Sequence, residues 1–85
     1  MKYKIVLQKS AEKFIRKQDK KTQTRIIIAL NQLPYQGDIN QLKGKNVKYR
    51  VRIGSIRAIY RLDNEQLIVD VLDIDNRGDI YKKIN

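Results

Sequence analysis

Cysteine, histidine and tryptophan are all absent from this chain of 85 residues, and proline occurs once. Without cysteine, neither a disulfide nor a thiolate metal site can stabilise the fold. Without histidine, the usual base of near-neutral proton transfer is missing, and so are the ligands of most zinc sites. The fold therefore depends on packing of Ile, Leu, Val and Tyr, and any catalysis has to use other groups.

Long hydrophobic runs are absent as well. No apolar stretch approaches the ~18 residues of a membrane-spanning helix, and the apolar core of the N-terminal MKYKIVLQKS is too short for a signal peptide. We therefore expect no membrane association and a cytoplasmic location. The length suits one domain, so we expect residues 1–85 to fold as a single unit.

Acidic residues are few relative to basic ones. The chain has 19 Lys and Arg against 9 Asp and Glu, a formal net charge of +10. Such an excess favours an anionic partner, which is a nucleic acid, a membrane surface or an acidic protein. Because 41% of the residues are apolar and 33% charged, the composition indicates a globular chain rather than a disordered one.

The first half of the chain has the patterns of one strand and two helices. Alternation predicts a strand over Tyr3–Leu7. Ser10 and Asp19 are the expected N-caps of helices over Ala11–Gln18 and Lys20–Leu33. The single proline then ends the second helix, and the polar stretch 35–46 is predicted to be a loop.

The stretch VKYRVRIGSIRAIYRL, residues 47–62, predicts a β-hairpin. Gly54 and Ser55 form a two-residue loop of type II′, in which glycine takes the position of positive φ. Such a short loop determines the register. The expected cross-strand pairs are Ile53–Ile56, Arg52–Arg57, Val51–Ala58, Arg50–Ile59, Tyr49–Tyr60 and Lys48–Arg61.

One face of this hairpin is predicted to be basic, with the cations Lys48, Arg50, Arg52, Arg57 and Arg61. Directly opposed like charges are destabilising, and no acid occurs between Ile39 and Leu62. A polyanion, most simply a nucleic-acid backbone, would relieve the repulsion; solvation of the side chains is the alternative interpretation. Two further lysines, Lys43 and Lys45, precede the hairpin and extend its positive charge.

A third strand of the meander is predicted over Leu67–Ile74, with Leu62 opposite Leu67. Asp70 then lies opposite Ile59 and near two arginines, which indicates a salt-bridge partner rather than a catalytic acid. The element order β-α-α-β-β-β predicts an α+β fold, with an N-terminal strand and a helical hairpin packed on one face of a small antiparallel sheet. The basic face is expected to stay open on the other side.

The acids near the C-terminus do not form a convincing metal site. The run that begins at Asp73 resembles the start of a calcium loop, but Arg77 and Ile84 occupy two of the ligand positions. Asp73 and Asp75 share a strand face that Asp70 does not, so a magnesium site is weakly supported. We expect no metal and no cofactor.

The run YRVRIGSIRAIYRL, followed by a hydrophobic strand and NRGDIY, resembles the RelE/ParE superfamily of small bacterial and archaeal toxins over essentially the whole chain. The resemblance implies the RelE-like microbial RNase fold and a ribosome-dependent mRNA endonuclease. It also implies a cognate antitoxin, RelB-like or other, that wraps the toxin and keeps it inactive. Operator DNA would be bound only by the toxin–antitoxin complex. ParE-like members share the fold but target DNA gyrase.

The resemblance also implies site residues. The two basic residues on the first hairpin strand match Arg50 and Arg52, and the phosphate-contacting arginine of the next strand matches Arg57. The arginine and the aromatic residue near the C-terminus match Arg77 and Tyr81. The presence of all five favours the RNase branch over the gyrase branch.

The resulting expectation is a metal-independent cleavage in which the RNA 2′-OH attacks the adjacent phosphate. The predicted catalytic residues are Arg52, Arg57, Arg77 and Tyr81. The predicted RNA-binding residues are Arg50, Lys48, Arg61, Lys43, Lys45 and Lys82. Tyr81, Lys48 and Lys82 are alternative general bases, since a guanidinium is a poor base. A gyrase inhibitor and a non-catalytic RNA-binding module are the alternative functions.

Two structural interpretations stand beside these roles. Arg77 would form a salt bridge with Asp73 or Asp75, and Tyr81 would cover the edge of the sheet. The family pattern HRRDVY near the end of the chain also has substitutions here, since Asn76 and Gly78 replace its histidine and second arginine.

Overall fold

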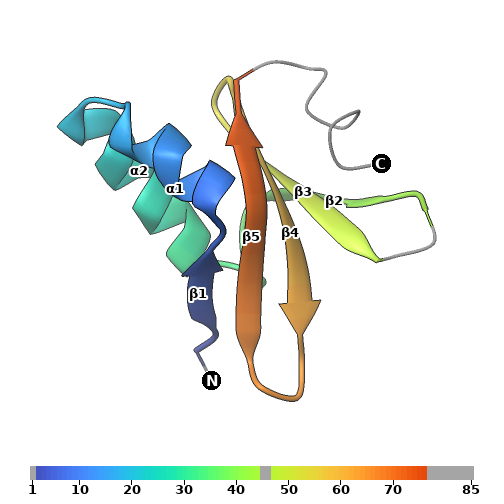
Figure 1. Ribbon diagram of the computed structural model, residues 1–85. Helices are drawn as coiled ribbons and strands as arrows, with labels where there is room; N and C mark the ends of the chain where they lie inside the picture. The colour runs from blue at the N-terminus through green and yellow to red at the C-terminus, as the bar shows by residue number, and fades with distance from the viewer. Residues whose placement is uncertain (1, 45–46, 77–85) are drawn as a thin grey trace.

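The computed structural model describes residues 2–44 and 47–76. Its elements are β1 (Lys4–Leu7), α1 (Lys9–Arg16), α2 (Lys20–Asn31), β2 (Asp38–Leu42), β3 (Lys48–Ile53), β4 (Ile56–Asp63) and β5 (Ile68–Asp75). The two helices lie on one face of a strongly twisted sheet, with α1 against β5 and α2 against β3 (Figure 1). The predicted α+β class is confirmed.

Both predicted helices are present, but only one begins at its predicted cap. The carboxylate of Asp19 accepts a hydrogen bond from the main-chain N–H of Thr22 at 3.1 Å, and hydrogen bonding to Thr22 lowers the pKa of Asp19. The N-cap of α1 is Gln8 rather than Ser10. Ser10 lies inside the first turn, where its hydroxyl donates to the carboxylate of Asp73 and ties α1 to β5.

The sheet has the strand order β1-β5-β4-β3-β2 and is mixed rather than purely antiparallel. β1 runs parallel to β5, with Lys4 opposite Ile68 and Leu7 opposite Val71. The other three strand pairs are antiparallel, and two of them, β3 with β4 and β4 with β5, were predicted. A parallel pair needs a crossover connection, and here the helices and three strands separate β1 from its partner.

The stretch predicted to be a loop contains an additional strand, β2. It pairs antiparallel with β3 and places Asp38 opposite Arg52 and Asn40 opposite Arg50. Its sequence, DINQL, has an irregular apolar pattern, and only Ile39 and Leu42 are partly buried. A strand at the edge of a sheet tolerates such polar residues because one of its sides faces solvent.

The hairpin register is confirmed from Ile53–Ile56 to Tyr49–Tyr60, and Gly54 in the turn has a φ of 62°. The predicted pairing of Leu62 with Leu67 is wrong. Leu67 has a φ of 56° and belongs to the turn, so β5 begins one residue later. Leu62 lies opposite Val69, and a bulge after Ile59 shifts the register again.

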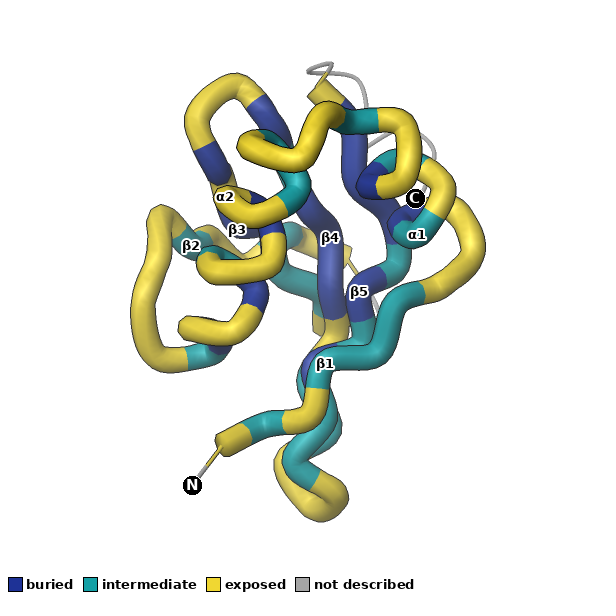
Figure 2. Tube along the Cα trace, turned by 90° about the vertical axis from the view of Figure 1, so that its left-hand side faces the viewer, coloured by how far each residue is buried: buried dark blue, intermediate teal, exposed yellow. Residues whose placement is uncertain are grey.

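The hydrophobic core fills the space between the helices and the sheet. Figure 2 shows its buried residues along β4 and β5. Tyr60 is the largest of them, with 1% of its surface exposed. Its ring stacks on Tyr49 with centroids 5.5 Å apart, and burial, with a smaller contribution from Tyr49, raises the pKa of Tyr60 to about 12. Neither helix within the described ranges has the length and apolar character of a membrane span.

Candidate functional site

The hairpin places a row of arginines on the face of the sheet that the helices do not cover. Strand side chains alternate between faces, and Val51, Ala58 and their apolar neighbours point into the core. The opposite positions carry Arg50, Arg52, Arg57 and Arg61, which we call the arginine face. Arg52 and Arg57 are directly opposed beside the turn. The prediction that these four arginines share one face of the sheet is therefore confirmed.

Arg50 is the most enclosed member of the arginine face, with 7% of the residue exposed. Its Nη1 donates to the main-chain carbonyl of Asp38 at 3.3 Å and lies 3.6 Å from the carboxylate of the same residue. Its Nη2 donates to the side-chain oxygen of Asn40 when that amide is turned toward it. The guanidinium of Arg50 thus fastens β2 to β3.

Arg52 is much more accessible, with 48% of its side chain exposed. Its Nε lies 4.0 Å from the carboxylate of Asp38, at the outer limit of an ion pair. This contact engages Nε and leaves the Nη side of the guanidinium for another anion. Asp38 therefore balances two arginines at once, although the sequence between Ile39 and Leu62 contains no acid.

Sequence reasoning missed Asp38 because the loop prediction hid the strand that carries it. The signal that could have found it is weak. Ile39 and Leu42 are three residues apart, which does not match strand alternation, so the apolar pattern of DINQL gives no indication of pairing. Only the pairing of β2 with β3 brings Asp38 beside Arg52.

β5 supplies acids on the other side of the arginine face. Asp70 lies opposite Arg61 rather than Ile59, and its carboxylate is 3.1 Å from Nη2 of Arg61. Its predicted role as a salt-bridge partner of an arginine is confirmed. Asp75 lies opposite Arg57 in the same ladder. The face is therefore a row of arginines with acids at both margins, not a uniformly basic surface.

The centre of the arginine face is closed. Ile59 alternates onto this face, yet none of its surface is exposed. Arg57, two residues before Ile59 on β4, is half-buried, while Arg52 is exposed. An approaching anion therefore meets the face first at the end near the Gly54 turn. The expected open basic surface is confined to this end and to the exposed Arg61.

The remaining predicted site residues are distributed differently. Lys43 is exposed just after β2, and Lys48 begins β3 and is half-buried. Four of the predicted site residues lie outside the part of the chain that the structure describes. They are Lys45, Arg77, Tyr81 and Lys82. Their assembly with the hairpin, and the alternative salt bridge of Arg77, remain predictions.

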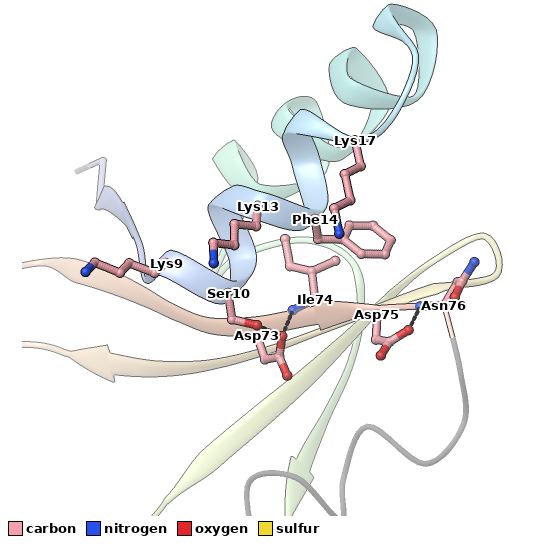
Figure 3. A pocket seen from close by; sticks show the side chains of 9 residues that line it. All are labelled: Lys9, Ser10, Lys13, Phe14, Lys17, Asp73, Ile74, Asp75 and Asn76. Carbon is pink, nitrogen blue, oxygen red and sulfur yellow. Dashed lines mark hydrogen bonds between the residues drawn. The ribbon is translucent and has the colours of Figure 1, made fainter.

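A separate cavity of about 580 Å³ lies between α1 and the end of β5. Figure 3 shows the side chains of Lys9, Lys13 and Lys17 along one side of the helix, with Asp73 and Asp75 on the strand beside them. The cavity has both charge signs, and it meets the margin of the arginine face at Asp75, which lies opposite Arg57. Within residues 2–44 and 47–76, no three potential ligands are grouped so that they could hold a metal ion.

Known toxin structures share this architecture. The archaeal RelE of a RelE–RelB complex from Pyrococcus horikoshii OT3 is 24% identical with a TM-score of 0.76, over 92% of this chain and 98% of that one. The chain matched in the toxin–antitoxin complex RelBE2 from Mycobacterium tuberculosis is 20% identical with a TM-score of 0.75, over 91% and 100% of the two chains. The isolated E. coli RelE toxin is 19% identical with a TM-score of 0.68, over 96% and 94%.

The fold of two helices on a five-stranded mixed sheet is thus shared with these solved toxin structures. The family model described as "ParE toxin of type II toxin-antitoxin system, parDE" matches residues 5–81. The chain belongs to this family, within the RelE/ParE superfamily, as its sequence resemblance indicates. No curated protein matches the sequence.

Proposed function

We propose that this toxin is a ribosome-dependent mRNA endonuclease. The observation that carries the proposal is the direct opposition of Arg52 and Arg57 at the accessible end of the arginine face. Two guanidinium groups on neighbouring strands are suited to the oxygens of one phosphate, because each offers several N–H donors in a planar fork. RelE-like toxins are the structures that this chain matches over most of its length.

The reaction assigned to this site is attack of the RNA 2′-OH on the adjacent phosphate. Arg52 and Arg57 stabilise the negative charge that builds up on the phosphate, where fixed charges lower the barrier. Arg50 holds the first hairpin strand against β2 and so positions Arg52. In this proposal Arg77 stabilises the leaving oxygen, and Tyr81 stacks on a base.

The proton acceptor is the part of the mechanism with alternatives, and Tyr81, Lys48 and Lys82 are the candidates. Neighbouring cations lower the pKa of a phenol or an ammonium group. Such a shift would make one of these groups a more effective base. Further RNA contacts are assigned to Arg61, Lys43 and Lys45.

A cognate antitoxin is the proposed partner that keeps the toxin inactive in the cytoplasm. The RelE proteins of Pyrococcus horikoshii OT3 and Methanococcus jannaschii have been solved in complexes with RelB. The +10 charge of this chain favours an acidic partner. Operator DNA would be bound by the toxin–antitoxin complex rather than by the toxin alone.

Inhibition of DNA gyrase is the second candidate function. It is favoured by one observation, which is that the matching family model describes a ParE toxin. A gyrase inhibitor would act through a protein surface and would leave mRNA intact. The two functions can be separated because one leaves cut transcripts and the other leaves unsupercoiled or broken DNA.

Primer extension on an mRNA that is being translated in the presence of purified toxin tests the proposal. We expect cuts inside codons that require ribosomes and are lost in Arg57→Ala, while Arg16→Ala on α1 cuts like the unaltered chain. Intact mRNA together with inhibited gyrase supercoiling would replace the proposal with the second candidate. RNA binding without any cleavage or gyrase inhibition would leave a non-catalytic module.

A further inference from the structure

The outer side of α2 exposes large apolar side chains. Ile27 and Ile28 are 40% and 55% exposed, although the same helix buries Ile26 and Leu30 in the core. Neighbouring residues on a helix are about 100° apart, so the two side chains form a ridge with two flanks. Exposed isoleucines next to one another mark an interaction site more often than isolated ones do.

A hollow lies on each flank of this ridge. The larger hollow, about 450 Å³, is bounded by Ile28 and Ala29 on the helix and by Ile53 on β3. The smaller one, about 160 Å³, is bounded by Ile27 and by Ile5 of β1. We call the ridge and its two hollows the α2 groove. Its shape suits side chains inserted on both sides of the ridge.

The charge at the rim of the α2 groove is positive. Lys21 and Arg25 border the larger hollow, and α2 contains no acid. Neither cation forms an ion pair within the described part of the chain, and the one nearby acid, the N-cap Asp19, interacts with Arg25 only through a minor long-range attraction. A second copy of this chain would bring the same cations against one another, and each copy has a net charge of +10. The groove therefore fits an acidic partner rather than a homodimer.

The larger hollow also adjoins the turn of the arginine hairpin. Ile53 precedes that turn, and a guanidinium nitrogen of Arg25 lies 3.4 Å from the position that a Cβ on Gly54 would occupy. The accessible end of the arginine face, with Arg52 and Arg57, begins on the other side of the same turn. A segment seated in the hollow can continue around the turn to these arginines.

We infer that the α2 groove is the docking site of an amphipathic, acidic segment of the cognate antitoxin. This inference rests on the proposed pairing with an antitoxin. The segment inserts branched apolar side chains beside Ile28 and places carboxylates opposite Lys21 and Arg25. From there the antitoxin reaches the arginine face around the Gly54 turn. Docking and inhibition thus use neighbouring but separable surfaces.

Titration of the purified toxin with the product of the adjoining antitoxin reading frame tests the inference by calorimetry. Ile28→Asp should weaken binding by at least about 30-fold, the size of an interface hot spot. Val47→Asp is the matched control, because Val47 is 54% exposed but lines neither hollow, and it should change the dissociation constant less than about threefold. Arg25→Glu should weaken binding about tenfold at low salt and less at 0.5 M salt, because salt screens exposed charges.

Equal affinities for Ile28→Asp and the unaltered toxin would overturn the inference, and so would an equal loss in Val47→Asp. Two further outcomes would also overturn it. In both, the antitoxin affinity of Ile28→Asp stays unchanged. In the first, the substitution abolishes a toxin dimer seen by sedimentation equilibrium, and in the second it abolishes binding to anionic phosphatidylglycerol vesicles. The far-UV circular dichroism of each variant checks its fold. The titration measures binding and not cleavage, so its result is valid even if the toxin cleaves no mRNA. A failure of the docking inference can therefore be distinguished from a failure of the proposed function.

Discussion

Replacing Arg50 should destabilise the protein, whereas replacing Arg52, two residues away on the same strand, should not. Arg50 donates a hydrogen bond to the main-chain carbonyl of Asp38, and a second to Asn40 when that amide is turned toward it. It also lies 3.6 Å from the carboxylate of Asp38, with 8% of its side chain exposed. Hydrogen bonds to a charged group contribute about 1.5–3 kcal/mol each. Asp38 is 59% exposed and can be hydrated when the guanidinium is removed, so we expect Arg50→Ala to lower the free energy of unfolding by about 2–3 kcal/mol in total.

Arg52 has one contact, at 4.0 Å, between two side chains that are 48% and 59% exposed. Such a pair contributes about 0–1 kcal/mol, and often nothing measurable. Arg52→Ala should therefore leave the free energy of unfolding within about 0.5 kcal/mol of its original value. Its effect should instead be the loss of ribosome-dependent cleavage, since Arg52 is assigned to the phosphate.

Urea unfolding followed by far-UV circular dichroism measures the difference, because the chain has no tryptophan. With an m-value of about 1 kcal/mol/M for a chain of this size, the midpoint should fall by about 2 M urea for Arg50→Ala and by less than about 0.5 M for Arg52→Ala. A total stability of roughly 5–10 kcal/mol leaves both variants folded in buffer. Equal midpoints, or a larger shift for Arg52→Ala, would refute the assignment of Arg50 as the fastener of β2.

Three further predictions concern single groups. Asp38→Asn removes the carboxylate that balances the arginines, so it should tighten RNA binding at low salt and steepen the log–log salt dependence by about one unit; anisotropy titrations with unchanged slopes would contradict this. Because the pKa of Tyr60 is raised from 10.0 to about 12, its contribution is complete below pH 10, and thermal stability should fall as the pH rises from about 10 to about 12; absorbance at 295 nm should show a phenol that ionises near pH 12 and is missing in Tyr60→Phe. Ser10→Ala removes a hydrogen bond from buried Asp73 and should cost about 1–2 kcal/mol, whereas Thr24→Ala on the exposed side of α2 should cost less in urea unfolding.

The hairpin is the part of the fold that the sequence predicts most completely. A two-residue turn joins its strands, so every cross-strand neighbour follows from local residue order. The next turn is less informative, because Leu67 takes a left-handed φ of 56° that a leucine does not indicate. The register of β5 therefore differs from the prediction, although Asp70 still meets an arginine.

The parts that sequence reasoning missed depend on neighbours far apart in the chain. β2 is an edge strand with exposed polar residues, so it lacks the apolar alternation that reveals a strand. Without β2, Asp38 has no visible relation to Arg50, and Arg50 looks like a free phosphate ligand. The positions of the arginines are thus predictable from sequence, while their unequal burial follows only from the strand that packs beside them.

The pairing of the first strand with the last has a consequence for biosynthesis. β1 pairs with β5 over Lys4–Ile68 to Leu7–Val71, and the main-chain N–H of Lys4 donates to the carbonyl of Leu67 at 2.7 Å. The N-terminal strand is translated first but has no partner until β5 has left the exit tunnel of the ribosome. Such non-local contacts form late, so the sheet is completed only after nearly the whole domain has been synthesised. Each copy of the toxin therefore lacks its complete sheet while translation of its own domain is still under way.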